Sequence, residues 1–351
     1  MQRIQYFFKM IIFMGLLGCI SLYSQINRGY SQVTQELNIY SSRHYETDEA
    51  LYSDFTKLTG IKINRLDGGE DLLIERIRNE GRNSPADILI TADAGRLWRA
   101  DQLNLLASVK SKFLENRIPG HLRHPDGHWF GFSSRARVII YNTQSVKAGE
   151  LKSYQDLANP KWKGKICMRA SGNVYNLSLL GSIIAHEGEE AAEQWAKGVQ
   201  ENFAREPVGG DTDQMKAVAA GECAITVANT YYYMRLVRSD KSEDKKIVRN
   251  IGIVFPNQDG YGTHVNISGA AMLRYAPHPE AAVKFLEYLA SDSAQRYFAE
   301  GNNEYPVVST VQVMPTLAAL TSKFKIDPLN VAVFAAKQPA AQRIFDSVGW
   351  R

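Results

Sequence analysis

The sequence contains few cysteines, which limits the metal sites and cross-links that the chain can form. Only three occur among its 351 residues, Cys19, Cys167 and Cys223. A zinc site with four thiolates is therefore excluded. Cys167 and Cys223 each lie in an apolar, strand-like run. If those runs are neighbouring strands, the two thiols could form a disulfide in an oxidising compartment; two separate buried thiols fit the sequence equally well.

The sequence also lacks the short motifs that accompany common enzyme reactions. It has no G-x-S-x-G nucleophile turn, no G-x-x-x-x-G-K-[ST] phosphate loop, no H-E-x-x-H zinc helix and no G-x-G-x-x-G after a strand. We therefore expect a protein that catalyses no reaction. A hydrolase or transferase on an α/β scaffold is the alternative from another class, and turnover by the metal-free protein would support it.

Charge of one sign is not in large excess. The formal net charge is +4, and two of the positive residues, Arg3 and Lys9, lie among the first eighteen, which contain no acid. In the remainder 39 basic residues face 37 acidic ones without a long basic run. The sequence therefore has no nucleic-acid footprint. We expect a monomer that is soluble or tethered at its first residue.

The N-terminal segment has the pattern of an export signal. Its two basic residues precede an apolar run from Met10 to Gly18, which is shorter than the about 20 residues of a membrane span. We expect residues 1–18 to be a signal peptide. Leu16-Leu17-Gly18-Cys19 resembles a bacterial lipobox, in which Cys19 would carry a lipid after cleavage. A plain signal that ends near Ser24 is the alternative.

From residue 37 onward, strand-like runs alternate with amphipathic helical patterns. Strands are predicted at 37–41, 61–66, 87–91, 138–141, 165–169, 223–228, 251–255 and 268–273, and helices at 48–59, 70–80, 175–186, 189–200, 212–220, 231–238 and 279–290. This alternation is typical of an α/β protein with a mainly parallel sheet covered on both faces. The pattern starts afresh near residue 135 without a low-complexity linker. We therefore expect two lobes joined by strand crossings, a hinged clamshell in which ligands bind beyond the carboxyl ends of strands.

Tyrosines follow several predicted strands, at the ends where ligands bind. Tyr45 follows the first strand, Tyr175 follows the strand at 165–169, and Tyr231 and Tyr232 follow the strand at 223–228. Phenolate oxygen is a hard, anionic donor, and hard trivalent cations prefer oxygen ligands. A free phenol has a pKa of about 10, but a bound cation lowers it. These positions favour Fe³⁺ over Ca²⁺, Mg²⁺ or Zn²⁺; an aromatic helix start without a ligand is the alternative.

Helical geometry selects two tyrosines of the run Tyr231-Tyr232-Tyr233. At about 100° per residue, Tyr233 points nearly opposite Tyr231, so at most two of the three share a face. Arg235 is four residues from Tyr231 and three from Tyr232, and it therefore lies on their face. Two phenols and a guanidinium facing one point would be an unusual choice for a protein core.

A group of three histidines, His121, His124 and His128, suggests another metal site. Proline, glycine and charged residues surround them. We therefore predict a solvated loop there, with a metal site as the alternative.

The pattern His44-Tyr45, Ser171-Gly-Asn173 with Tyr175-Asn176, and Asn229-Thr-Tyr-Tyr232 resembles the periplasmic ferric-iron-binding proteins of ABC transporters, particularly their tyrosine-rich cyanobacterial branch. The similarity runs from about residue 36 to the C-terminus. Carried over residue by residue, the pattern of the family implies that the iron ligands are Tyr45, Tyr175, Tyr231 and Tyr232. His44 matches a histidine that is a ligand in only some members. The glutamate ligand of other branches has no clear match here.

The resemblance implies a periplasmic-binding-protein fold and a transport function. Lobe 1 would comprise 36–134 and about 262–305, and lobe 2 would comprise 135–261 and about 306–351. Fe³⁺ would bind between the lobes, and the closed form would deliver it from the periplasm to an ABC permease in the inner membrane. Because four phenolates exceed the charge of the ion by one, Arg235 and Arg135 would offset that charge or bind a small synergistic anion.

Two alternatives share this architecture. A receptor for an organic or oxyanionic solute would use the tyrosines for stacking and Arg235 to pair an anion, and it would bind its solute without added metal. An iron-binding protein that protects a membrane complex fits the same resemblance.

Overall fold

The computed structural model describes residues 35–43, 47–321 and 324–351. The chain divides into two units, Met1–Gln35 and Glu36–Arg351, and the helices and strands of the described residues belong to the second. The predicted signal peptide at 1–18, the lipidation site Cys19 and the predicted ligands His44 and Tyr45 lie outside the described residues. Within the described ranges, no helix has the length and apolar character that crossing a membrane requires.

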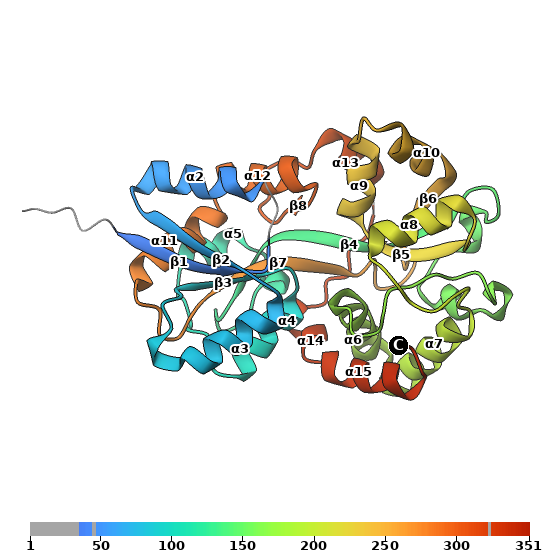
Figure 1. The fold of residues 1–351 in the computed structure, drawn as a ribbon, viewed down its shortest axis with the longest axis horizontal. Coiled ribbons are helices and arrows are strands. Elements are labelled where there is room, and N and C mark those ends of the chain that lie inside the picture. Colours follow the sequence, from blue (N-terminus) through green and yellow to red (C-terminus); the bar gives the residue numbers. More distant parts are fainter. Residues whose placement is uncertain (1–34, 44–46, 322–323) are drawn as a thin grey trace, which may run out of the picture. The chain divides into compact units, whose positions relative to one another are not determined.

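Strands and helices alternate in the first part of the second unit (Figure 1). They are β1 (Glu36–Ser41), α2 (Asp48–Thr59), β2 (Lys62–Asp67), α3 (Glu70–Glu80), β3 (Ile88–Thr91), α4 (Ala94–Gln102) and α5 (Lys112–Arg117). Helix α2 shows how the sequence sets such boundaries. Two acids, Asp48 and Glu49, lie in its first turn, and it ends at Gly60, whose left-handed backbone lets its N–H donate to Thr56 O.

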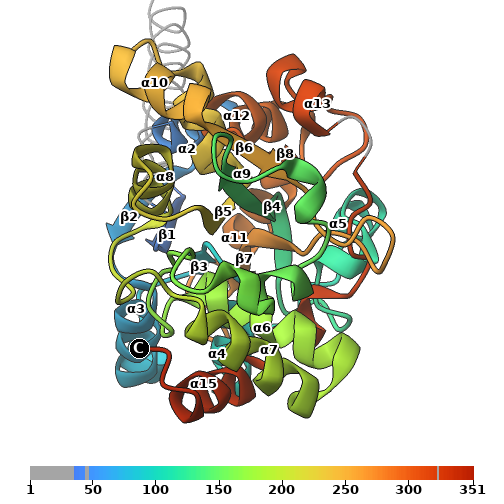
Figure 2. The same cartoon turned by 90° about the vertical axis from the view of Figure 1, so that its right-hand side faces the viewer.

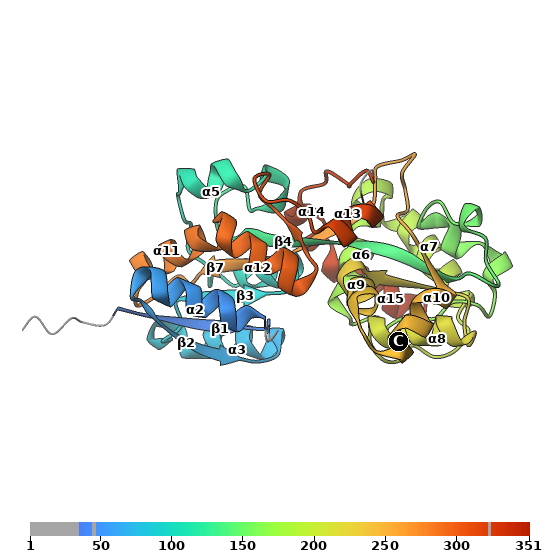
Figure 3. The ribbon, with the colours of Figure 1, turned by 90° about the horizontal axis from the view of Figure 1, so that it is seen from above.

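Long strands connect this part to the next, as Figure 3 shows for β4 (Phe130–Asn142). The first half of β4 pairs with β7 (Val265–Met272) and β8 (Tyr305–Pro306), and its second half pairs with β5 (Ile225–Asn229) and β6 (Ile251–Val254). Strand β7 also pairs with β3, which gives the order β2-β1-β3-β7-β4-β5. One strand shared by two groups of elements is a strand crossing, and the expected two-lobed α/β fold is confirmed.

The second group of elements follows β4, and a C-terminal series of helices follows β7. The second group contains α6 (Val174–Glu187), α7 (Glu189–Glu201), α8 (Asp211–Ala220), α9 (Thr230–Arg238) and α10 (Ser242–Asn250). The C-terminal series is α11 (Pro279–Leu289), α12 (Asp292–Asn302), α13 (Pro315–Thr321), α14 (Val331–Ala335) and α15 (Gln338–Ser347). Helices α6, α7 and α15 lie together in Figure 2 and share one core.

Three clusters of buried apolar side chains form the core. The first lies among β1–β3, α2–α4, α11, α12 and α14, where Phe55 and Phe285 meet edge to face with ring centroids 5.1 Å apart. The second joins α6, α7 and α15, and the third lies among α8, α9 and β4. The C-terminal series contributes Phe334 to the first cluster and Phe345 to the second. The lobe boundaries expected from the sequence stay a prediction.

Two sequence predictions about strands are wrong. Among the described strands, parallel pairing is confined to β1–β2 and β1–β3, whereas β4 pairs antiparallel with β5, β6, β7 and β8. The strand predicted at 165–169 is reduced to isolated bridges at Ile166. The carbonyls of Arg169 and Ala170 accept hydrogen bonds from the side chain of Asn176, at 3.0 and 3.2 Å, instead of continuing a strand ladder.

The two cysteines left open by the sequence form a disulfide. Cys167 and Cys223 are buried, with Cα atoms 5.8 Å apart. The backbone N–H of Cys167 donates to Ile225 O at 3.0 Å, so the bridge lies beside the point where 165–167 touches the start of β5.

Candidate metal centre

The tyrosine doublet lies where β5 ends and α9 begins. All five residues of β5 are buried, and the N–H of its last residue, Asn229, donates to Asp211 Oδ2 at 2.8 Å. The chain therefore leaves the sheet at a fixed point and enters α9 at Thr230. Tyr231, which is 2% exposed, and the half-buried Tyr232 occupy the first turn with ring centroids 4.2 Å apart.

Arg235 lies one turn further along the same helix face. Its guanidinium carbon is 5.3 Å from the ring centroid of Tyr231 and 5.6 Å from that of Tyr232. Tyr233 packs in the third core cluster, where burial raises its pKa. The structure thus divides the three tyrosines as helical spacing predicts.

Tyr175 reaches the doublet from α6. The side chain of Asn173 caps this helix and accepts the backbone N–H of Tyr175 at 3.2 Å, which fixes the tyrosine in the first turn. The Oη atoms of Tyr175 and Tyr231 are 3.2 Å apart. Neighbouring oxygens on a small octahedral cation, each bound at about 2 Å, lie about 2.8 Å apart. A small approach would therefore let both phenols share one ion, and oxygen donors suit a hard trivalent cation.

A cleft of about 610 Å³ borders these side chains. Its wall on the side of α6 and α9 includes Tyr175, Tyr232 and Arg235, and its opposite wall includes Ser42, Arg43 and the segment 67–70. Arg43 is buried and pairs with Asp48 at 3.2 Å and Glu304 at 3.0 Å. The residues that directly precede His44 and Tyr45 in the sequence therefore line the cleft.

Three guanidinium groups surround the ring of Tyr175. The guanidinium carbons of Arg135, Arg137 and Arg169 lie 5.5, 5.7 and 5.4 Å from its centroid. The fully buried Asp211 accepts from Arg137 at 2.6 Å and from Arg169 at 3.1 Å, and it holds both in place. Positive charge at this distance favours a phenolate over a phenol.

Arg135 has spare capacity for an anion. Burial works to lower the pKa of this guanidinium, but the neighbouring Tyr175, Asp93 and Tyr231 raise it above its usual value. Its Nη2 donates to Ala92 O, whereas its Nε and Nη1 have no hydrogen-bond partner among the described residues. Buried donors are nearly always satisfied, so these two suit a ligand that carries negative charge.

The structure brings together most of the predicted site. Tyr175, Tyr232 and Arg235 line the cleft, and the buried Tyr231 and Arg135 lie against Tyr175. Sequence reasoning missed Arg137, Arg169 and Asp211. The alternation of Arg135 with Arg137 in an apolar strand places both on one face and could have indicated Arg137. We find no sequence signal for Asp211, because it meets the two arginines only through the fold.

Known proteins resemble this chain over most of its length. Residues 83–325 match the family model described as bacterial extracellular solute-binding protein. Iron uptake protein A1 of Synechocystis sp. is 49% identical over 317 residues, covering 90% of this chain and 88% of that protein; Iron uptake protein A2 is 49% identical over 330 residues, covering 93% and 94%. The solved structure of Trichodesmium FutA (IdiA) in complex with iron and citrate has 53% identity and a TM-score of 0.86, covering 90% of this chain and 100% of that one.

The fold and the cleft define a two-lobed binding protein, in which a ligand would lie between two α/β lobes. The family match extends over more than half of the chain. The chain belongs to the bacterial extracellular solute-binding protein family.

Proposed function

We propose that this protein is an extracytoplasmic receptor that captures Fe³⁺ in the cleft. Tyr175, Tyr231 and Tyr232 supply three phenolates. Tyr45 supplies a fourth, and His44, the preceding residue in the sequence, is a further candidate ligand. The observation that carries the proposal is the approach of Tyr175 Oη to Tyr231 Oη at 3.2 Å, with the Tyr232 ring against Tyr231. Hard anionic oxygens that converge in this way suit a ferric ion better than a soft or divalent one.

Charge around the cleft supports the same conclusion. Four phenolates exceed the charge of Fe³⁺ by one, and guanidinium groups of Arg135, Arg169 and Arg235 lie within about 6 Å of the tyrosine rings. They offset the excess negative charge and keep the phenols ionised. The spare donors of Arg135 also suit a small carboxylate, and citrate accompanies iron in the Trichodesmium structure.

The protein would act in the periplasm, after export through its N-terminal signal, and deliver iron to an ABC permease in the inner membrane. Closure of the lobes would shield the ion from water, and no reaction would be catalysed. Cys19 would tether the protein if it is lipidated. Membership of the solute-binding family and 49% identity to two iron uptake proteins support this role.

Equilibrium competition with citrate tests the proposal. We expect the full chain to take up one Fe³⁺ from ferric citrate at neutral pH. Tyr175→Phe should weaken binding by about 100-fold or more, because even the partners behind a metal ligand are worth about 10- to 100-fold. Tyr261→Phe is the matched control, since this tyrosine stacks on His186 with centroids 3.9 Å apart and does not line the cleft. Equal iron affinity in both variants would contradict the proposal.

A further inference from the structure

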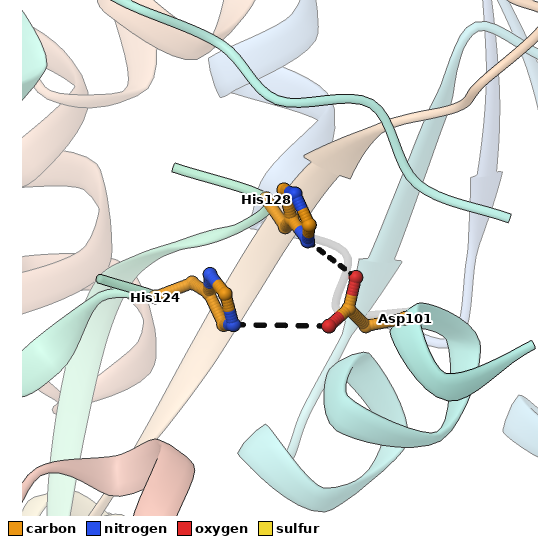
Figure 4. A group of neighbouring side chains, drawn as sticks. All are labelled: Asp101, His124 and His128. Carbon is orange, nitrogen blue, oxygen red and sulfur yellow. Dashed lines mark hydrogen bonds and ion pairs between the residues drawn. The ribbon is translucent and has the colours of Figure 1, made fainter. Parts of the chain in front are cut away.

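A second group of metal-binding side chains lies apart from the tyrosines. Asp101 is on the last turn of α4, and His124 and His128 lie on the turn that leads into β4 (Figure 4). Each offers one ligand atom, and these atoms all lie within 4.8 Å of one another. Among the described residues, this is the one group of three or more His, Cys, Asp or Glu side chains with such spacing.

The two imidazole rings face one carboxylate. His128 Nδ1 is 2.5 Å from Asp101 Oδ1, and His124 Nε2 is 3.7 Å from Asp101 Oδ2. The rings are stacked, with centroids 4.7 Å apart and an angle of 2° between their planes. The exposed fractions are 13% for Asp101, 15% for His124 and 32% for His128. The loop predicted from the sequence is present, and both histidines are partly exposed in it, but Asp101 on α4 lies against them.

The turn that carries the histidines is held independently of any ion. The N–H of His124 donates to Trp129 O at 3.0 Å, and the N–H of Gly127 donates to His124 O at 3.1 Å. Gly127 has a φ of 74°, and a Cβ there would lie 2.6 Å from Val109 O, so the turn requires glycine. His124 and His128 are thus placed side by side by the backbone.

We propose that Asp101, His124 and His128 bind a divalent first-row cation such as Zn²⁺, with water in the fourth position. Two imidazoles and one carboxylate are a donor set that zinc accepts, and three protein ligands leave a position open. Tetrahedral ligands at about 2.1 Å from zinc lie about 3.4 Å apart. Small rotations of Asp101 and the more exposed His128 would bring the three ligand atoms, now between 2.5 and 4.8 Å apart, to this spacing.

Binding changes the tautomer of His124. Its Nδ1 accepts the backbone N–H of Asp126 at 3.1 Å, so the neutral ring carries its proton on Nε2, which faces Asp101. A cation on Nε2 moves that proton to Nδ1, at the expense of one exposed hydrogen bond from Asp126. The negative charges of Asp101 and Asp126 favour the cation in return.

The site lies at the far end of the helix that starts beside the tyrosine cleft. Helix α4 has nine residues and is about 13 Å long; Ala92, just before it, lines the cleft. A cation at Asp101 would fasten the turn at 124–129 to this helix without completing the tyrosine site. The inference therefore does not depend on iron binding.

Zinc titration of the iron-loaded full chain, prepared without a polyhistidine tag and freed of citrate, tests the site by calorimetry. We expect one Zn²⁺ per chain and at least a tenfold loss of affinity in His128→Asn. His278→Asn is the matched control, because His278 Nδ1 also pairs with a carboxylate, Asp87 Oδ2 at 3.0 Å, but is not part of the three-residue group. No zinc uptake by the wild-type chain, or equal uptake by His128→Asn, would overturn the proposal.

Two further readouts separate a lost ligand from a damaged fold. Zinc should raise the thermal midpoint of the wild-type chain and of His278→Asn, but not that of His128→Asn or Asp101→Asn. The Asp101→Asn side chain has the shape of the aspartate without its charge. The ¹⁵N spectrum of the imidazoles should also show the proton of His124 moving from Nε2 to Nδ1. A zinc-induced rise of equal size in every variant, or an unchanged tautomer at saturation, would contradict the site.

Discussion

Tyr175, Tyr231 and Tyr232 share a position in their helices. Each lies in the first turn, Tyr175 in α6 and the other two in α9. The first turn of α6 is capped by Asn173, and the positive end of each helix dipole stabilises negative charge placed near it. In the proposed iron complex, the helix dipoles and the surrounding arginines would both stabilise negative charge on these tyrosines.

Arg235 gives a prediction at this scale. Replacing it by glutamine removes one positive charge from the faces of Tyr231 and Tyr232. We expect Fe³⁺ binding to weaken about tenfold, the effect of one favourable charge at a partly exposed site. Citrate competition measures the change. Arg249→Gln, an exposed arginine on α10, should leave the affinity unaltered, and an equal loss in both variants would show that only net charge matters.

His264 makes stability depend on pH. Burial, followed by the charges of Arg135 and Arg137, lowers its pKa to about 3, so the folded protein holds it neutral. The unfolded chain takes up a proton near pH 6.5, so stability is present above that pH and is lost as pH falls towards 3. From about pH 7.5 to about pH 5 we expect a loss of about 2 kcal/mol from this residue.

Urea unfolding at the two pH values tests this effect. His264→Gln cannot titrate, and its stability should fall by about 2 kcal/mol less than that of the wild type over the same interval. Parallel pH profiles for the two proteins would show that His264 is not held neutral.

At the scale of elements, the disulfide joins two segments whose backbone pairing is limited to an isolated bridge between Ile166 and Ile225. Cys167 and Cys223 are 56 residues apart in sequence, and reducing the bond frees a loop of that length in the unfolded chain. Loop entropy predicts a loss of about 4 kcal/mol. The free energy of unfolding, measured with and without a reductant, gives the value. The double variant Cys167→Ala/Cys223→Ala should not respond to the reductant, and an unchanged wild type would argue against the bond.

The helices could be predicted because their signals are local. Acidic first turns, terminal glycines and apolar periodicity mark α2 and α3 from end to end. Strand direction and the segment at 165–169 could not be predicted. That segment is apolar enough for a strand, but the carbonyl of Arg169 accepts from the side chains of Asn176 and Trp350 instead of from a neighbouring strand. Such competition appears only when the chain has folded.

In the candidate site, too, the residues that lie on one helix could be predicted, and those that come from separate elements could not. Tyr231, Tyr232 and Arg235 lie on one helix, so spacing places them together. The side chains around Tyr175 come from three separate places. Arg137 is on β4, Arg169 precedes α6, and Asp211, which pairs with both, starts α8. Residues that converge from separate elements leave no pattern in one sequence.

At the scale of the whole molecule, Asp93 connects elements that are far apart in the sequence. It caps α4 through Gly95 N, and its carboxylate accepts from Ser178 on α6, Asn266 on β7 and Gln338 on α15. This group is fully buried. Its hydrogen bonds therefore fix the helices on either side of the crossing strands.

Asp93→Ala should be strongly destabilising. It removes a helix cap and leaves buried donors of Ser178, Asn266 and Gln338 short of a partner, which we expect to cost about 3 kcal/mol or more. Urea unfolding measures the loss. Ser291→Ala removes the cap of α12, where the serine accepts from Ala294 N, and should cost only about 1 kcal/mol. Similar losses in both would mean that Asp93 is only a cap.

The absorption spectrum of the iron-loaded protein tests the tyrosine site most directly. Charge transfer from phenolate to Fe³⁺ should make the protein orange to red after loading with ferric citrate at neutral pH. Tyr231→Phe and Tyr232→Phe should each weaken the visible band, because one phenolate ligand is removed, and Tyr233→Phe, whose ring packs in the core, should keep it unchanged. A colourless wild-type protein, or a band that survives unchanged in both Tyr231→Phe and Tyr232→Phe, would contradict the account.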